Sequence, residues 1–262
     1  MSLASALVAP VTVKRLDVPV ARVAQLSEIE RYAYYMLGHL FNELMFFQKL
    51  LHFAIPKHDD ARPLRRLPEY GQLFLVARIV AGKLWEAKVA LERRDLSRAI
   101  TDSFAPLTPD GQDRLTGWKR RLAKAKWPEK LRNGHSFHYP SFEQWQHVLR
   151  VDASWEDDQI YLAKESGNVF YAGSDAIAHH SMFGQLDPVD PKSAVDPMVS
   201  ELISLLGEFT STVEDVLGAF VAHRLFDNEV PPESVEGAVD TALFEHVIIP
   251  FWTNMPPRDA AK

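Results

Sequence analysis

The chain has 262 residues, of which 47% are hydrophobic and 24% charged, and its formal net charge is −6. These are the values of an ordinary globular protein that can bury a core, so disorder as the main state is excluded. The chain has no cysteine, which excludes disulfides and thiolate metal or redox sites. No stretch approaches the ~18 uninterrupted apolar residues of a membrane span. We therefore expect a soluble, cytoplasmic protein that contacts no membrane.

Long helices are predicted in the first part of the chain, after an N-terminal segment, residues 1–26, that we expect to be loosely ordered. Ser27 and Glu30 have the spacing of a capping box, in which each residue satisfies a backbone donor of the other. Apolar residues then recur at helical spacing until Pro56 ends the helix. A second helix is predicted over residues 68–94. The two helices would pack as an antiparallel hairpin.

Shorter helices are predicted in the middle of the chain. Thr108 followed by Pro109 is a favoured helix start, with the threonine as N-cap. Pro140 stops a helix because the residue before a proline is pushed out of the helical region. Ser141 and Gln144 form a second capping box. The helices predicted from these signals cover residues 96–104, 109–126, 129–139 and 141–150.

One β-hairpin and a third long helix complete the predicted fold. Residues 159–162 and 169–171 favour strands and flank the turn-forming cluster Glu165-Ser166-Gly167-Asn168. A proline-rich linker at 187–197 precedes a helix predicted over 197–226. The tail should contain a further helical piece near 235–247.

The predicted fold class is therefore mainly α, a helical bundle with long antiparallel helices and one small β-hairpin. Residues 27–186, which include the hairpin, would form one helical domain. Residues 195–262 would supply a long helix and a tail that pack on this bundle.

Positive charge is concentrated between Arg114 and Arg132, where Glu129 is the single acidic residue. Such a stretch can simply be a solvated helix face. It can also attract the phosphate backbone of a nucleic acid. The candidate nucleic-acid-binding residues are Lys119, Arg120, Arg121, Lys124, Lys126 and Lys130.

The common catalytic and cofactor motifs are missing from the sequence. It contains no P-loop, no dinucleotide-binding glycine pattern, no nucleophile elbow and no H-E-x-x-H zinc motif. The remaining metal candidates are His135 with His138, and the adjacent His179 and His180, but each pair needs a third ligand. We therefore expect no cofactor and no metal ion, and keep a metal-binding bundle as a weaker alternative.

A nine-residue segment in the middle of the chain reads Leu-Arg-Asn-Gly-His-Ser-Phe-His-Tyr. Arg132 and His138 are separated by five residues, Asn133 follows the arginine directly, and aromatic residues flank the histidine. This pattern resembles the signature of the HEPN superfamily, helical nucleotide-binding domains in which a histidine follows an arginine a few residues later. The long helices predicted around the segment agree with this resemblance.

The resemblance implies a metal-independent endoribonuclease or an RNA-binding protein. In such cleavage the 2′-hydroxyl of RNA attacks the adjacent phosphate, leaving a cyclic phosphate and a 5′-hydroxyl. Arg132 would stabilise charge on the phosphate, His138 would transfer a proton and Asn133 would hold either in place. Side chains six positions apart on a helix point about 120° apart. Members of the superfamily pair two protomers so that two motifs face one cleft, and the resemblance therefore also implies a homodimer.

A second function remains open on the sequence alone. The chain could be a non-catalytic helical protein whose long helices bind a partner or serve a structural role, with the motif as a remnant. The expected partners are thus RNA, a second copy of the chain, and a protein antidote or other protein partner.

Overall fold

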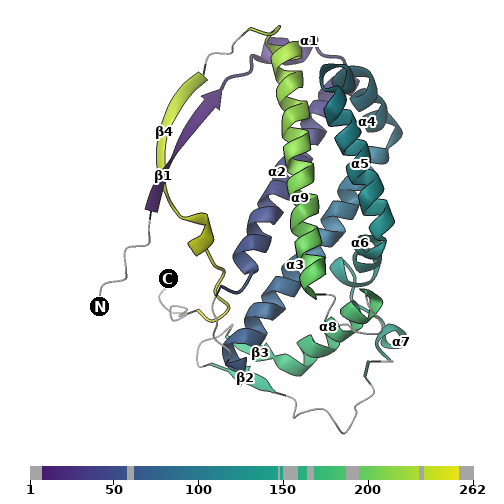
Figure 1. The fold of residues 1–262 in the computed structure, drawn as a ribbon, viewed down its shortest axis with the longest axis vertical. Helices are drawn as coiled ribbons and strands as arrows, with labels where there is room; N and C mark the ends of the chain where they lie inside the picture. The colour runs from purple at the N-terminus through teal and green to yellow at the C-terminus, as the bar shows by residue number, and fades with distance from the viewer. Residues whose placement is uncertain are drawn as a thin grey trace, which may run out of the picture. The chain divides into compact units, whose positions relative to one another are not determined.

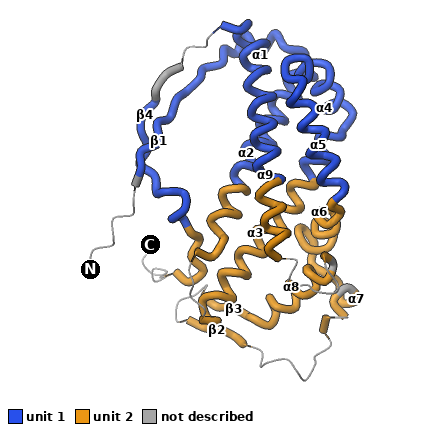
Figure 2. Tube along the Cα trace, in the orientation of Figure 1, with its two compact units in different colours: residues 1–46, 86–124, 205–247 blue, residues 47–85, 125–204, 248–262 orange. Residues whose placement is uncertain are grey.

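The computed structural model describes residues 8–57, 62–146, 148–149, 159–163, 168–186, 195–229 and 233–253. In these residues the fold is mainly α-helical, with two small antiparallel two-stranded sheets (Figure 1). The chain forms two compact units (Figure 2). Unit 1 contains residues 1–46, 86–124 and 205–247, and unit 2 contains residues 47–85, 125–204 and 248–262. Helices α2, α3 and α9 contribute residues to both units, so each unit is made of three separate stretches of the chain.

The α-helices are α1 (Val20–Gln25), α2 (Glu28–Ala54), α3 (Pro63–Glu92), α4 (Arg94–Ala99), α5 (Pro109–Ala125), α6 (Trp127–Leu131), α7 (Phe142–Trp145), α8 (Ala172–Leu186) and α9 (Val195–Phe220). Short π-helical turns are η1 (Ile100–Phe104), η3 (Arg132–Ser136) and η5 (Val221–Leu225), and short 3-10 turns are η2 (Ala105–Leu107) and η6 (Phe244–His246). The strands are β1 (Val8–Leu16), β2 (Ile160–Leu162), β3 (Val169–Tyr171) and β4 (Glu233–Ala242). Over the described residues, no helix is both long and apolar enough to cross a bilayer.

Helix α2 begins where the capping box predicts. The Ser27 amide donates to Glu30 Oε2 at 3.0 Å, and the Glu30 amide donates to Ser27 Oγ at 3.3 Å. Arg224 of η5 also donates to Glu30 Oε1, at 2.7 Å. Burial alone would raise the pKa of Glu30, but the Ser27 hydrogen bonds and Arg224 outweigh it and lower the pKa. The carboxylate therefore joins the start of α2 to η5 within unit 1.

Helix α3 begins at Pro63, five residues before the predicted start, and contains Pro68 in its interior. A proline has no amide hydrogen, so it cannot satisfy the carbonyl four residues earlier, that of Leu64. In the structure the indole of Trp252 donates to the Leu64 carbonyl at 2.7 Å. The C-terminal tail thus supplies the hydrogen bond that Pro68 removes, and the helix continues through the proline.

The predicted hairpin is confirmed, because β2 and β3 pair antiparallel, with Ile160 opposite Tyr171. Glu165 to Gly167 of the predicted turn, and residues 187–194 of the predicted linker, lie outside the described residues. Helix α8, which follows the hairpin, was not predicted. The helix predicted over 141–150 is confined to α7, so its predicted end is wrong.

Two predictions for the chain ends are wrong. Residues 8–16, expected to be loosely ordered, form β1, and residues 233–242, expected to be partly helical, form β4. The strands lie side by side (Figure 1) and pair antiparallel. Val11 is opposite Val239, and the register shifts after Val13. Paired residues of the two strands are more than 200 positions apart in the chain, so local sequence patterns could not predict the pairing.

Each unit has its own apolar core. In unit 1 the ring of Phe104 stacks on that of Phe220 with centroids 4.0 Å apart, and the buried Trp118 indole donates to the Leu205 carbonyl at 2.9 Å. In unit 2 the ring of Phe74 on α3 meets the rings of His179 and Phe183 on α8 edge-on. The α3–α8 contact forms one side of the candidate site.

Candidate functional site

Unit 2 contains a cavity of about 560 Å³. Segments that lie far apart in the chain form its walls: α3, the end of η3 and the residues after it, α7, β3, α8 and the C-terminal tail. Aromatic side chains make up much of the lining, and these are Phe137, Tyr139, Trp145, Phe170, Tyr171 and Phe251. Polar side chains also line it, and these are Arg78, His135, Ser136, His138, Ser174 and Asp175. A volume of this size can hold a ligand as large as a nucleotide.

One face of α3 forms the α3 wall of the cavity. Gly71, Leu75, Arg78 and Gly82 are spaced by four, three and four residues, so they share a single helical face. A Cβ atom at Gly71 would lie 2.6 Å from Asp175 Oδ2, and one at Gly82 would lie 2.8 Å from the Ser136 Cβ. The two glycines therefore let α8 and the η3 segment approach α3 closely, while Leu75 and Arg78 between them line the cavity.

A hydrogen bond from Ser136 connects η3 to α3. The Ser136 hydroxyl lies within hydrogen-bond distance of the backbone carbonyl of Arg78, and 3.0 Å from that of Leu131. The π-helical turn ends at Ser136, and His138 follows in a bend of the chain. The helix therefore does not continue past Ser136, and the residues that follow line the cavity.

Arg78 brings a positive charge to the cavity. Its Nε atom is buried and has no hydrogen-bond partner among the described residues. No described carboxylate lies within ion-pair distance of its guanidinium. Because a guanidinium presents up to five donors, Arg78 has capacity left for an anionic ligand.

Asp175 and His179 lie one turn apart on α8, beside Arg78. The His179 Nε2 is 3.5 Å from Asp175 Oδ2. Burial lowers the pKa of His179 to about 4, and repulsion from Arg78 adds to this effect, so the imidazole is neutral at neutral pH. Burial raises the pKa of Asp175, while the positive charge of Arg78 acts in the opposite direction. The neutral imidazole of His179 therefore contacts Asp175, which lines the cavity, whereas His179 itself is not part of the lining.

The three candidate catalytic residues separate into two places. Arg132 and Asn133 lie on η3, where Arg132 Nη1 donates to Asn133 Oδ1 at 2.9 Å. Neither belongs to the cavity lining, whereas the exposed His138 does. The helix was predicted to continue to residue 139 but ends at Ser136, so the angle expected between Arg132 and His138 does not apply. Their catalytic role stays a prediction.

The candidate nucleic-acid-binding residues fall into both units. In unit 1, Arg121 of α5 forms an ion pair with Glu208 of α9 at 3.0 Å, which reduces its availability for phosphate. Arg120 and Lys124, one turn apart on α5, are exposed, and Lys119 is half-buried. In unit 2, Lys126 and Lys130 are exposed. Lys119, Arg120, Lys124 and Lys126 thus keep solvent-facing surface without a described carboxylate within ion-pair distance. Lys130 is also exposed and has a further interaction.

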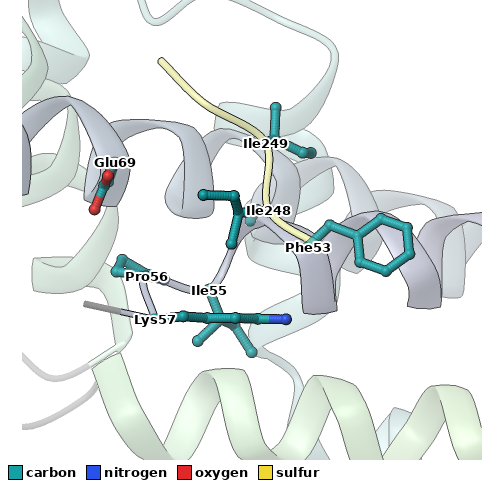
Figure 3. Close-up of a pocket in the computed structure, with 8 residues that line it drawn as sticks. Phe53, Ile55, Pro56, Lys57, Glu69, Ile248 and Ile249 are labelled. Carbon is teal, nitrogen blue, oxygen red and sulfur yellow. The ribbon is translucent and has the colours of Figure 1, made fainter. Parts of the chain in front are cut away.

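A second hollow in unit 2 is too small for a ligand. Residues 248 and 249 of the tail cross the end of α2 beside Phe53, Lys57 and Glu69 (Figure 3). The Ile249 amide donates to the Phe53 carbonyl at 3.0 Å. The cavity beneath measures about 10 Å³, space for one water at most. This contact anchors the tail.

The histidines considered for metal binding do not form a cluster. Across the described part of the chain, no group of three or more His, Asp or Glu side chains has the arrangement to hold a metal ion. His135 and His138 both line the cavity, while His179 packs against Phe74 and His180 is exposed.

No family model, curated protein or solved structure matches the chain. The HEPN resemblance accordingly stays a prediction. Arg78 and Asp175 were not among the predicted site residues. The available signal was an arginine between two glycines on one face of a long helix, and its meaning depends on which segments pack on that face.

Proposed function

We propose that the protein binds single-stranded RNA in the unit 2 cavity and cleaves it without a metal ion. The observation that supports this proposal is that His138 lines the same cavity as Arg78, an arginine whose guanidinium has no described partner. An arginine can stabilise charge on a phosphate and a histidine can transfer a proton, which are two tasks in metal-independent cleavage of a phosphodiester.

The aromatic lining supports RNA as the ligand. Single-stranded RNA exposes the faces of its bases, and proteins bind these faces by stacking them on aromatic side chains. Phe170 and Tyr171 on β3 and Tyr139 after η3 line the cavity with such rings. A duplex would not offer its base faces to these rings, so the proposal is limited to unpaired RNA.

In the proposed reaction, the 2′-oxygen forms a bond to phosphorus as the bond from phosphorus to the 5′-oxygen breaks. The products are a 2′,3′-cyclic phosphate and a 5′-hydroxyl. Arg78 would stabilise the charge that develops on the phosphate oxygens. His138, exposed to solvent, would exchange the proton that the 2′-hydroxyl loses or the 5′-oxygen gains. Arg132 and Asn133 would hold the adjoining phosphate.

The test is cleavage of a fluorescent single-stranded RNA in EDTA, with the products analysed for a cyclic phosphate. We expect His138→Ala to reduce the rate at least about 100-fold, the usual range for removal of a general acid or base. Arg78→Ala should reduce it similarly. The matched controls are His180→Ala and Arg66→Ala, two exposed residues of α8 and α3 outside the cavity lining. Cleavage that survives His138→Ala would disprove the assignment.

A second candidate function is self-association, and the paired strands of unit 1 favour it. Residues 10–16 of β1 are exposed without interruption, so both faces of the strand lie open. Val11 and its partner Val239 are 51% and 52% exposed. A two-stranded ribbon is marginal on its own in water, and its edges can pair with another strand. A homodimer formed through this ribbon should appear in sedimentation equilibrium, and a monomer at all concentrations would rule it out.

A further inference from the structure

The cavity contains a carboxylate that RNA cleavage does not use. Asp175 lines the cavity, and a negative charge there repels the phosphate that Arg78 attracts. No Arg or Lys in the described residues lies within ion-pair distance of it, and its neighbour His179 is neutral near pH 7. Asp175 is half-buried, and a carboxylate that is partly withdrawn from water without strong donors is unfavourable. Donors on a ligand would relieve this cost.

The carboxylate of Asp175 lies between the α3 backbone and the imidazole of His179. Its Oδ2 faces the α3 backbone, where a Cβ atom at Gly71 would lie 2.6 Å away, and the His179 Nε2 lies 3.5 Å from the same oxygen. A side chain larger than hydrogen at position 71 would push the carboxylate away. Polar groups that line a cavity discriminate between ligands because a mismatched ligand leaves them without a partner.

The chemistry of the four RNA bases identifies the ligand that fits. A carboxylate only accepts hydrogen bonds, and its two oxygens can accept two parallel ones. Guanine alone presents two adjacent donors on its Watson–Crick edge, the N1–H and the 2-amino group. Adenine, cytosine and uracil each present one donor group there. The rings of Phe170 and Phe251, whose centroids are 5.4 Å apart, offer aromatic surface beside the carboxylate.

We propose that Asp175 selects guanine, and that the cavity binds a guanosine nucleotide with its base at Asp175 and its phosphate at Arg78. For a guanosine within an RNA strand, this inference rests on the proposed function. The same chemistry would also bind a free guanosine mononucleotide. The expected preference over the other bases is about tenfold or more, the discrimination that one good bidentate contact provides.

The experiment measures binding of uncleavable 2′-O-methyl heptamers that contain six uridines and a central G, A, C or U. Fluorescence anisotropy with the full-length protein gives the dissociation constants. The wild-type protein should bind the central-G strand about tenfold more tightly than the other three. Asp175→Asn should reduce this preference to about threefold or less, because the amide offers one acceptor where the carboxylate offers two. Asp196→Asn, an exposed acid at the start of α9, should leave it unchanged.

Each outcome decides one of the two proposals. Equal binding of all four strands overturns the guanine inference and leaves RNA binding intact. A guanine preference that survives Asp175→Asn overturns the role of Asp175. If no strand binds, RNA binding fails, and calorimetric titration with GMP, AMP, CMP and UMP then decides the inference. Selective GMP binding supports it, and equal or absent binding overturns it. The comparison of the four strands uses the wild-type protein, so it tests the guanine preference even if Asp175→Asn does not fold.

Discussion

Replacing Gly82 by alanine tests the close approach of η3 to α3. The new Cβ would lie 2.8 Å from the Ser136 Cβ and 2.9 Å from Phe137 Cε2. The first distance is about 0.6 Å below the 3.4 Å at which ordinary van der Waals contact begins. The Ser136 Cβ is attached directly to the backbone, so the neighbouring segment has to move. Overpacking of this kind costs about 1–3 kcal/mol, and the better helix propensity of alanine returns up to ~1 kcal/mol.

We therefore expect Gly82→Ala to lower the free energy of unfolding by up to about 2 kcal/mol, measured by urea denaturation followed by circular dichroism. Gly38→Ala in the middle of α2 is the matched control, because nothing lies within 4 Å of its new Cβ. It should raise the free energy of unfolding by about 0.5–1 kcal/mol. If both substitutions stabilise the protein equally, the close packing of η3 on α3 is refuted.

Two further substitutions test the surroundings of the cavity. The pKa of His179 is about 4 in the folded state and 6.5 in the unfolded state. Between pH 4 and 6.5 the unfolded state therefore binds more protons, and the free energy of unfolding rises with pH. When the pH falls from 6.5 to about 4, the free energy of unfolding of the wild-type protein should fall by up to about 3 kcal/mol. His179→Gln should remove this decrease, and the control His180→Gln should retain it. Equal pH profiles for all three proteins would contradict the buried neutral imidazole. Trp252→Phe should cost about 0.5–1 kcal/mol by removing the donor to Leu64. In a Pro68→Ala background the cost should largely disappear, because the alanine amide takes over that carbonyl; an unchanged cost in the double mutant would show that the two sites are independent.

The second half of the predicted functional segment, from His135 to Tyr139, lines the observed cavity, and its first half does not. His138 lines the cavity, whereas the arginine that lines it is Arg78 rather than Arg132. The motif spacing indicates which residues lie near each other along the chain. It carries no information about a side chain on another helix. Arg78 becomes part of the site because Gly82 allows the η3 segment to pack against α3.

The amino-acid sequence by itself determined the local elements of this protein. These elements depend on interactions between residues that are close in the chain, so the sequence predicts them directly. They include the capping box at Ser27, the apolar spacing of α3 and α9 and the strand residues of the 160–171 hairpin. Only the tertiary structure decided the pairing of β1 with β4, the passage of α3 through Pro68, and the joining of Arg78, His138 and Asp175 in one cavity. Each of these depends on a contact between residues distant in the chain, and the free energy of such a contact is set by packing and burial that no local pattern records.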